Sequence, residues 1–292
     1  MNPQSAINYG LFVQFVADTW NTGSNTNNLD GKAVTDNSNN PIISGCNYTI
    51  LHTVYANDLA TDINPTRPIT EGFKTMAIVI ANDADPNDIV IAIRGTLTVY
   101  EWLQDAKFLY KPFSKVPSAG LTEDGFTDMY FSFSLSNTGG GGDFVTNLKS
   151  ILPVTARITV VGHSLGAGIA SLCAIDLAAN TAFPITCYTL ASPRVGDLTF
   201  ANLYNHIVPN AYRVANRLDV VPKVPPPVMY VHVGDETELI PPSNLKFDLG
   251  CEHHLTSYFN MLETLINPTS TQYPIQPDCL NGSATPTNAA ED

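Results

Sequence analysis

The sequence is poor in charge, and above all in positive charge. Only 14% of its 292 residues are charged, and 14 Lys and Arg face 27 Asp and Glu, for a net charge of −13. Such an excess of negative charge repels phosphate backbones, and no local cluster of Lys or Arg offsets it. The composition therefore argues against nucleic acid as a partner. It also disfavours anionic membrane surfaces and leaves neutral lipid open.

Cysteine is also scarce. The five cysteines include no CxxC pair, so neither a zinc ribbon nor a disulfide-dense scaffold is indicated. Cys173 and Cys187 lie in apolar runs and are expected to be buried thiols. Cys46, Cys251 and Cys279 lie in polar stretches, where one disulfide could form in a pairing that the sequence leaves open.

A targeting signal and a membrane span are both lacking. The apolar run 11–17 is short, and no basic residue precedes Lys32, whereas a secretory signal has a positive start and a longer apolar run. This fits a cytoplasmic protein or the mature form of a secreted one, and we favour the secreted form. Residues 158–175 carry no charge, but their glycines predict a strand, a turn and a buried helix, and not a transmembrane segment.

Apolar residues are plentiful, at 44% of the chain, which excludes disorder of the whole molecule. The length allows one or two domains. Because no shift in composition divides the chain, we expect a single domain over residues 1–292, with a loosely packed tail from about residue 268.

Strand and helix patterns alternate through most of the chain. Two β-branched runs joined by a turn-rich segment, 73–81 and 88–95, predict an antiparallel hairpin. Alternating strands and helices follow it, at 158–161, 170–178, 185–190, 200–206 and 212–216, before a strand pair at 230–239 and a last helix at about 252–266. This order predicts an α/β fold with a mostly parallel central sheet and helices on both faces.

Residues 162–166 read Gly-His-Ser-Leu-Gly and match the pattern GxSxG. A β-branched strand leads into the pattern, and a helix of small residues follows it. A nucleophile elbow has this form, because its serine occupies a strained turn between strand and helix, and the glycines let the two approach closely. We therefore predict that Ser164 is a nucleophile; the alternative is a Gly-Ser turn that opens a buried helix.

A nucleophilic serine needs a histidine base, and that histidine needs a carboxylate to orient it. After a GxSxG elbow these follow in the order acid, then histidine. The other histidines precede the serine, belong to the motif or lie within earlier elements, which leaves His253 and His254. Asp219 follows the predicted strand 212–216, at the edge of the sheet where α/β sites assemble. The alternative for Asp219 is a turn residue.

Five segments, in order, resemble the class 3 (fungal-type) triacylglycerol lipases of the α/β-hydrolase superfamily. They read IAIRGTLTVYEWLQD, VVGHSLGAG, YTLASPRVGD, YRVANRLDVVPKVPP and YVHVGDETEL, between residues 91 and 239. The resemblance implies an α/β-hydrolase fold, no metal or organic cofactor, and a triad of Ser164, Asp219 and a late histidine. It also implies an oxyanion hole formed by the backbone N–H groups of Thr96 and Leu165. The N–H of Leu165 is suited to this because the first residues of a helix have free N–H groups.

The same family places a short lid helix after the RGT motif. Here Val99, Trp102 and Leu103 fall on one face at helical spacing. Two interpretations stay open: a stripe that packs into the core, or a lid face that covers the site in water and turns towards lipid at an interface.

The doubled histidine leaves the base uncertain by one residue. The plant-like form of the family reads His, a polar residue, Leu, two residues and Tyr, and it selects His253 without a gap. The fungal form selects His254 after one deletion, and helical geometry weakly favours the same residue. We predict His253.

These features together predict a lipase or carboxylesterase that hydrolyses acylglycerols through an acyl-serine intermediate. Its partner is then an ester or lipid substrate, met at a lipid–water interface if the lid interpretation holds. The alternative enzymes are a phospholipase and an esterase for soluble or feruloyl-type esters, because one triad serves them all. The alternative of another class is a catalytically silent, lipase-like interaction protein.

Overall fold

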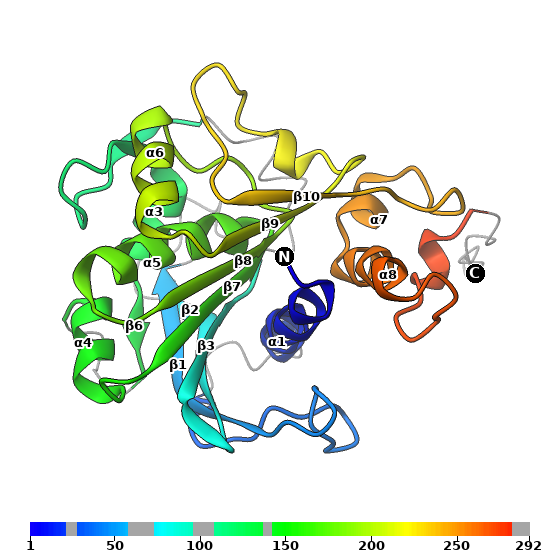
Figure 1. Ribbon diagram of the computed structural model, residues 1–292, viewed down its shortest axis with the longest axis horizontal. Helices are drawn as coiled ribbons and strands as arrows, with labels where there is room; N and C mark the ends of the chain where they lie inside the picture. The colour runs from blue at the N-terminus through cyan, green and yellow to red at the C-terminus, as the bar shows by residue number, and fades with distance from the viewer. Residues whose placement is uncertain (22–27, 58–72, 96–107, 137–141, 282–292) are drawn as a thin grey trace, which may run out of the picture.

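The computed structural model describes residues 1–21, 28–57, 73–95, 108–136 and 142–281 (Figure 1). Thr96 and the residues predicted to form the lid face, Val99, Trp102 and Leu103, lie outside this part of the chain.

An eight-stranded mixed sheet forms the centre of the described structure, in the order β10-β9-β8-β7-β3-β2-β1-β6. Its strands are β1 (Tyr48–Asn57), β2 (Phe73–Asn82), β3 (Asp85–Ile93), β6 (Ser134–Leu135), β7 (Arg157–His163), β8 (Ile185–Leu190), β9 (Ala211–Asn216) and β10 (Asp235–Leu239). Five adjacent strands run parallel to one another: β3, β7, β8, β9 and β10. At the other side of the sheet, β6, β1, β2 and β3 pair antiparallel in that order. The predicted hairpin is confirmed as β2–β3. The parallel strands and the helices that connect them confirm the predicted α/β class.

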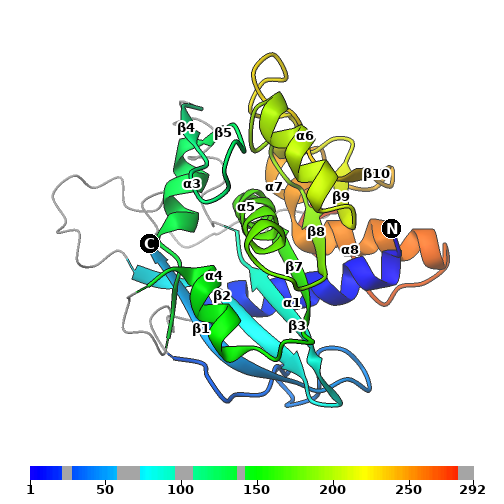
Figure 2. The ribbon, with the colours of Figure 1, turned by 60° about the vertical axis from the view of Figure 1, so that its left-hand side comes forward.

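Helices cover both faces of the sheet (Figures 1 and 2). One face carries α1 (Pro3–Asn21) and α8 (Leu255–Ile266), which pack side by side; the other carries α3 (Asp124–Phe131), α4 (Phe144–Ile151), α5 (Leu165–Asn180) and α6 (Leu198–Ile207). Successive side chains of a strand point to opposite faces, so Ile89 and Ile91 enter the core under α5 while Val90 and Ala92 enter the core under α1. A small second sheet pairs β4 (Tyr110–Pro112) with β5 (Leu121–Glu123).

Two predicted elements are wrong in part. Of the predicted strand pair, only β10 forms; Val231 makes a single bridge to Gly196, and Gly234, with a φ of 76°, turns the chain before β10. The predicted last helix is interrupted at His254, whose extended backbone (φ −62°, ψ 135°) ends α7 (Leu249–His253) and caps α8. The His254 side chain accepts a hydrogen bond from the N–H of Thr256 and so caps the start of α8.

The described tail beyond α8 is anchored at several points, where the sequence predicted loose packing. A disulfide joins Cys251 in α7 to Cys279 in the 3₁₀ turn η4 (Pro277–Cys279), and the Tyr273 ring packs edge-to-face on Phe259. Cys173 and Cys187 are buried free thiols, as predicted, and Cys46 is free and half-buried.

Residues 158–175 form most of β7, the following turn and the first part of α5, as predicted. Within the described ranges, none of the helices has both the length and the apolar character that crossing a membrane requires.

Candidate active site

Ser164 occupies the single position between β7 and α5. Its φ of 59° and ψ of −131° lie in a region that non-glycine residues rarely adopt, so the backbone here is strained. The side chain is almost fully buried, and its Oγ has no hydrogen-bond partner in the part of the chain that the structure describes. A strained, buried hydroxyl without a partner is available for chemistry with a group that enters from outside.

The two glycines of the motif are required by close approach of the backbone. A Cβ atom at Gly162 would lie 2.2 Å from the carbonyl oxygen of Gly166, and a Cβ at Gly166 would lie 2.3 Å from that of Arg94. No side chain fits at either position, because real Cβ contacts do not fall this short. The GxSxG pattern therefore reports the tight packing that forms the elbow between β7 and α5.

Asp219 and His253 lie in hydrogen-bond contact although 34 residues separate them. Asp219 follows β9, just before the 3₁₀ turn η3 (Val221–Lys223), and His253 is the last residue of α7. His253 Nδ1–H donates to Asp219 Oδ2 at 2.7 Å, and both side chains are buried. His253 Nε2 has no partner among the described residues, so the second ring nitrogen is free to take a proton.

The Asp219 carboxylate also receives two further hydrogen bonds. The Tyr258 hydroxyl donates to Oδ2 at 2.7 Å and accepts the N–H of Asn216 at 3.0 Å, and the N–H of Val221 donates to Oδ1 at 2.9 Å. Burial and the nearby Asp219 raise the pKa of Tyr258 well above its ordinary value, so the hydroxyl remains a donor. Together these donors stabilise the negative charge and fix the direction in which Asp219 faces His253.

The sequence prediction used the tyrosine at position 258 to set the register of the histidine, and it missed this role of Tyr258. It also missed Glu252, the neighbour of His253. The Glu252 side chain is buried, and its Oε1 has no partner within the described residues. Burial, and next the charge of Asp219, raise the pKa of Glu252. The spacing from His253 to Tyr258 was a signal for Tyr258, whereas the pattern did not include Glu252.

His254 faces a different set of partners. Its Nδ1 lies 2.9 Å from the Thr256 hydroxyl, and burial, followed by the neighbouring His253, lowers its pKa. It makes no contact with Asp219 among the described hydrogen bonds. Of the two candidate bases, the structure thus brings only His253 to the carboxylate.

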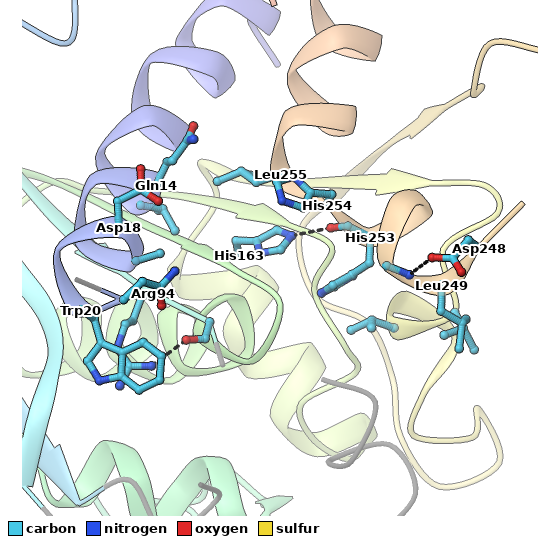
Figure 3. A pocket seen from close by; sticks show the side chains of 17 residues that line it. Gln14, Asp18, Trp20, Arg94, His163, Asp248, Leu249, His253, His254 and Leu255 are labelled. Atoms are coloured by element: carbon cyan, nitrogen blue, oxygen red, sulfur yellow. Dashed lines mark hydrogen bonds between the residues drawn. The ribbon is translucent and has the colours of Figure 1, made fainter. Parts of the chain in front are cut away.

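A cavity of about 560 Å³ opens beside His253 and His254 (Figure 3). The second half of α1, the end of β3, η3, α7 and the start of α8 surround it. His163 and His253 lie in its wall, and the apolar part of the lining comes from Val13, Ala17, Val220, Val221, Leu249 and Leu255. Such a mixture of apolar walls and a few polar groups is typical of small-molecule sites.

The segment that leads to Thr96 passes directly beside the elbow. A Cβ atom at Gly95 would lie 3.1 Å from the Cβ of Ser164 and 3.0 Å from the carbonyl oxygen of His163. Leu165 is the first residue of α5, so its N–H is not used by the hydrogen bonds of the helix. Thr96 itself lies outside the described residues.

The geometry defines a class of protein: an α/β-hydrolase fold in which a serine elbow, a buried acid–histidine pair and an apolar cavity lie together. Comparison with known proteins agrees. The sequence profile of the family described as Lipase (class 3) matches residues 90–229. Over this range the chain is similar to that family.

Several relatives are similar to this chain. A phospholipase A1-II 3 of Oryza sativa subsp. indica is 34% identical over 182 residues, which cover 54% of this chain and 43% of the relative. The secreted mono- and diacylglycerol lipase A of Penicillium camembertii is 29% identical over 241 residues, which cover 81% of this chain and 71% of the relative. The chain thus spans less than half the length of the plant phospholipase.

Solved structures show the same fold. A mutant form of MDLA from Penicillium cyclopium superposes with a TM-score of 0.61 at 24% identity, over 83% of each chain. A Rhizomucor miehei lipase in complex with its propeptide superposes with a TM-score of 0.56 at 21% identity, over 86% of this chain and 75% of that one.

Proposed function

We propose that the protein is a class 3 lipase that hydrolyses acylglycerol esters, with Ser164 as nucleophile, His253 as general base and Asp219 as the residue that orients the base. The observation that carries the proposal is the pair of buried atoms left without partners, Ser164 Oγ and His253 Nε2, together with the bond from the other nitrogen of His253 to Asp219. A histidine held in this way has the correct tautomer to accept a proton at Nε2.

The reaction proceeds in two halves. Ser164 Oγ attacks the ester carbonyl and gives its proton to His253 Nε2, while Asp219 stabilises the imidazolium that forms. The N–H groups of Leu165 and Thr96 bind the oxyanion of the tetrahedral intermediate. The C–O bond to the alcohol then breaks, His253 returns the proton to the leaving alcohol, and an acyl-serine remains. Water then attacks the acyl carbon and gives a proton to His253. The bond from that carbon to Ser164 Oγ breaks, the fatty acid leaves, and His253 returns the proton to Ser164 Oγ.

A fluorophosphonate probe and a short-chain nitrophenyl ester test the nucleophile together. Ser164→Ala should prevent labelling and lower kcat by about 10⁴-fold or more, because no other group can form the acyl intermediate. Ser171→Ala is the matched control: this serine is buried on the same helix and donates to the Ala167 carbonyl, away from Asp219 and His253. If folded Ser164→Ala kept more than a few per cent of the activity, the assignment would be wrong. A wild-type chain that is folded, unlabelled and inactive would instead favour the silent interaction protein.

Two alanine variants on the same ester identify the base. His253→Ala should lose nearly all activity, since Asp219 then has no imidazole to orient. His254→Ala should keep most of its rate, because His254 contacts Thr256 and not Asp219. The reverse pattern would move the base to His254.

A phospholipase A1 activity is the second candidate, because the plant relatives carry that name. Initial rates on diacylglycerol and on phosphatidylcholine, both presented in the same neutral micelle, separate the two. The disulfide and the names of the fungal relatives support our proposal that the protein is secreted.

A further inference from the structure

His163 links the nucleophile elbow to the backbone of the candidate base (Figure 3). It is the last residue of β7, immediately before Ser164, and its Nε2 lies 2.9 Å from the carbonyl oxygen of His253, 90 residues away in the sequence. The two imidazole rings also pack together, with centroids 4.7 Å apart and planes tilted by 36°. The sequence prediction treated His163 only as the variable residue of the motif.

The His253 carbonyl is available for this bond because the helix ends there. Both Ser257 and Tyr258 direct their N–H groups to the His254 carbonyl, at 2.9 and 3.3 Å, so α8 starts one residue too late to use the carbonyl of His253. A buried carbonyl without a donor is costly. His163 supplies that donor from the neighbouring strand.

The chemistry of the bond fixes the tautomer of His163. A carbonyl oxygen can only accept, so Nε2 carries the hydrogen and Nδ1 does not. Burial, and then the neighbouring His253, lower the pKa of His163 well below its ordinary value, which keeps the ring neutral. A neutral neighbour suits a base that becomes a cation during the reaction, because a second positive charge at this distance would oppose proton transfer.

We propose that His163 is a positioning residue: its Nε2–H holds the His253 main chain so that the imidazole stays aligned with Asp219 on one side and Ser164 on the other. The inference rests on the function proposed above. Because His163 and Ser164 are adjacent in the elbow, this hydrogen bond joins the segment that carries the nucleophile to the main chain of the base. Small displacements of a reacting group cost large factors in rate. Because His163 also lines the cavity, any substitution there changes the cavity wall, and the hydrogen bond has to be tested by comparing two variants that both change it.

A pair of variants of similar length isolates the hydrogen bond. Gln at position 163 can place an N–H where His places Nε2–H, whereas Met has a similar length and no donor. His163→Met should lower kcat on a short-chain nitrophenyl ester by about ten- to a hundredfold, with a KM within about twofold of that of His163→Gln. His163→Gln should recover kcat to within about threefold of the wild type. His206→Met, at an exposed position near the end of α6, is the control and should leave both constants unchanged.

The rate of inactivation by a fluorophosphonate gives a second readout, since it also depends on activation of Ser164 and should fall together with kcat in His163→Met. Equal losses in the Gln and Met variants would overturn the proposal, because they would assign the effect to ring packing alone. Unchanged kcat in His163→Met would overturn it as well. If His163→Met does not fold, as judged by a thermal melt, His163→Phe keeps the ring without the donor and replaces it. If the proposed ester hydrolysis itself were wrong, the wild type would be inactive as well, which distinguishes that result from a failure of the His163 proposal.

Discussion

Two buried carboxylates near the candidate base, Asp219 and Glu252, have opposite electrostatic environments. Asp219 receives donors from His253, Tyr258 and the Val221 N–H, whereas Glu252, next to His253, is buried with an oxygen that lacks a partner. Both oxygens of Asp219 thus accept hydrogen bonds, whereas a buried oxygen of Glu252 has none among the described residues, which is costly for a polar group. Sequence patterns select Asp219 by its place after a strand, but they contain nothing that distinguishes these two environments, because both depend on which groups fold against them.

Glu252 should therefore cost stability at neutral pH. Its pKa is raised in the folded protein, so the folded state favours the protonated acid, and the free energy of unfolding should fall as the pH rises from the ordinary Glu value through the raised one. Glu252→Gln removes this ionisation and should stabilise the protein at pH 8 by on the order of 1 kcal/mol. Thermal melts at pH 8 and pH 4 check this, and the gain over the wild type should shrink at pH 4, where Glu252 is protonated.

The exposed Glu238→Gln is the matched control and should change the melting temperature little at either pH. A variant Glu252→Gln that is less stable than the wild type at pH 8 would contradict the argument, since it would mean that the ionised carboxylate makes a stabilising contact.

At the scale of elements, sequence periodicity predicts what is buried in regular layers. The hairpin β2–β3 and the alternation from β7 to β9 follow from β-branched runs and helical stripes, and both are confirmed. The break between α7 and α8 is not predicted, because no glycine or proline marks it and a local hydrogen bond to the His254 side chain accompanies it. Strand β1 and helix α1 were also missed. A disulfide pairing is equally beyond reach, since it depends on how distant segments meet.

The Cys251–Cys279 disulfide ties α7 to the tail two residues before His253. Replacing both cysteines by serine should lower the free energy of unfolding by roughly 2–4 kcal/mol, because the unfolded chain is then less constrained. Denaturant titration measures this. Dithiothreitol should lower the melting temperature of the wild type and leave the double variant unchanged.

Cys46→Ser, which removes a half-buried free thiol, is the control and should behave as the wild type does. A wild type whose melting temperature does not respond to reductant would show that the α7–tail link adds nothing to stability.

At the scale of the molecule, one sheet organises both ends of the described chain around the cavity. The helices α1 and α8 pack together on one face (Figure 2). Residues from both helices line the same cavity as His253. The sequence could predict the parallel sheet and the edge at which Asp219 lies. It could not predict that α1 forms a wall of the cavity, because the contact of α1 with α8 is a property of the assembled core. The net charge, by contrast, follows directly from the amino-acid sequence.

If the protein is the lipase proposed above, its net charge of −13 should govern which lipid surfaces it works on. Repulsion between the protein and an anionic surface lowers its local concentration there, and salt screens that repulsion over about 10 Å at 0.1 M. With diacylglycerol held at a fixed fraction of phosphatidylcholine vesicles, replacing part of the phosphatidylcholine by phosphatidylglycerol should lower the initial rate at low ionic strength. Raising the salt concentration should restore most of it. The rate on purely zwitterionic vesicles, which carry no net charge, should respond little to salt and serves as the control. A rate that rises with phosphatidylglycerol content would mean that a local surface of the protein, and not its total charge, determines binding to lipid.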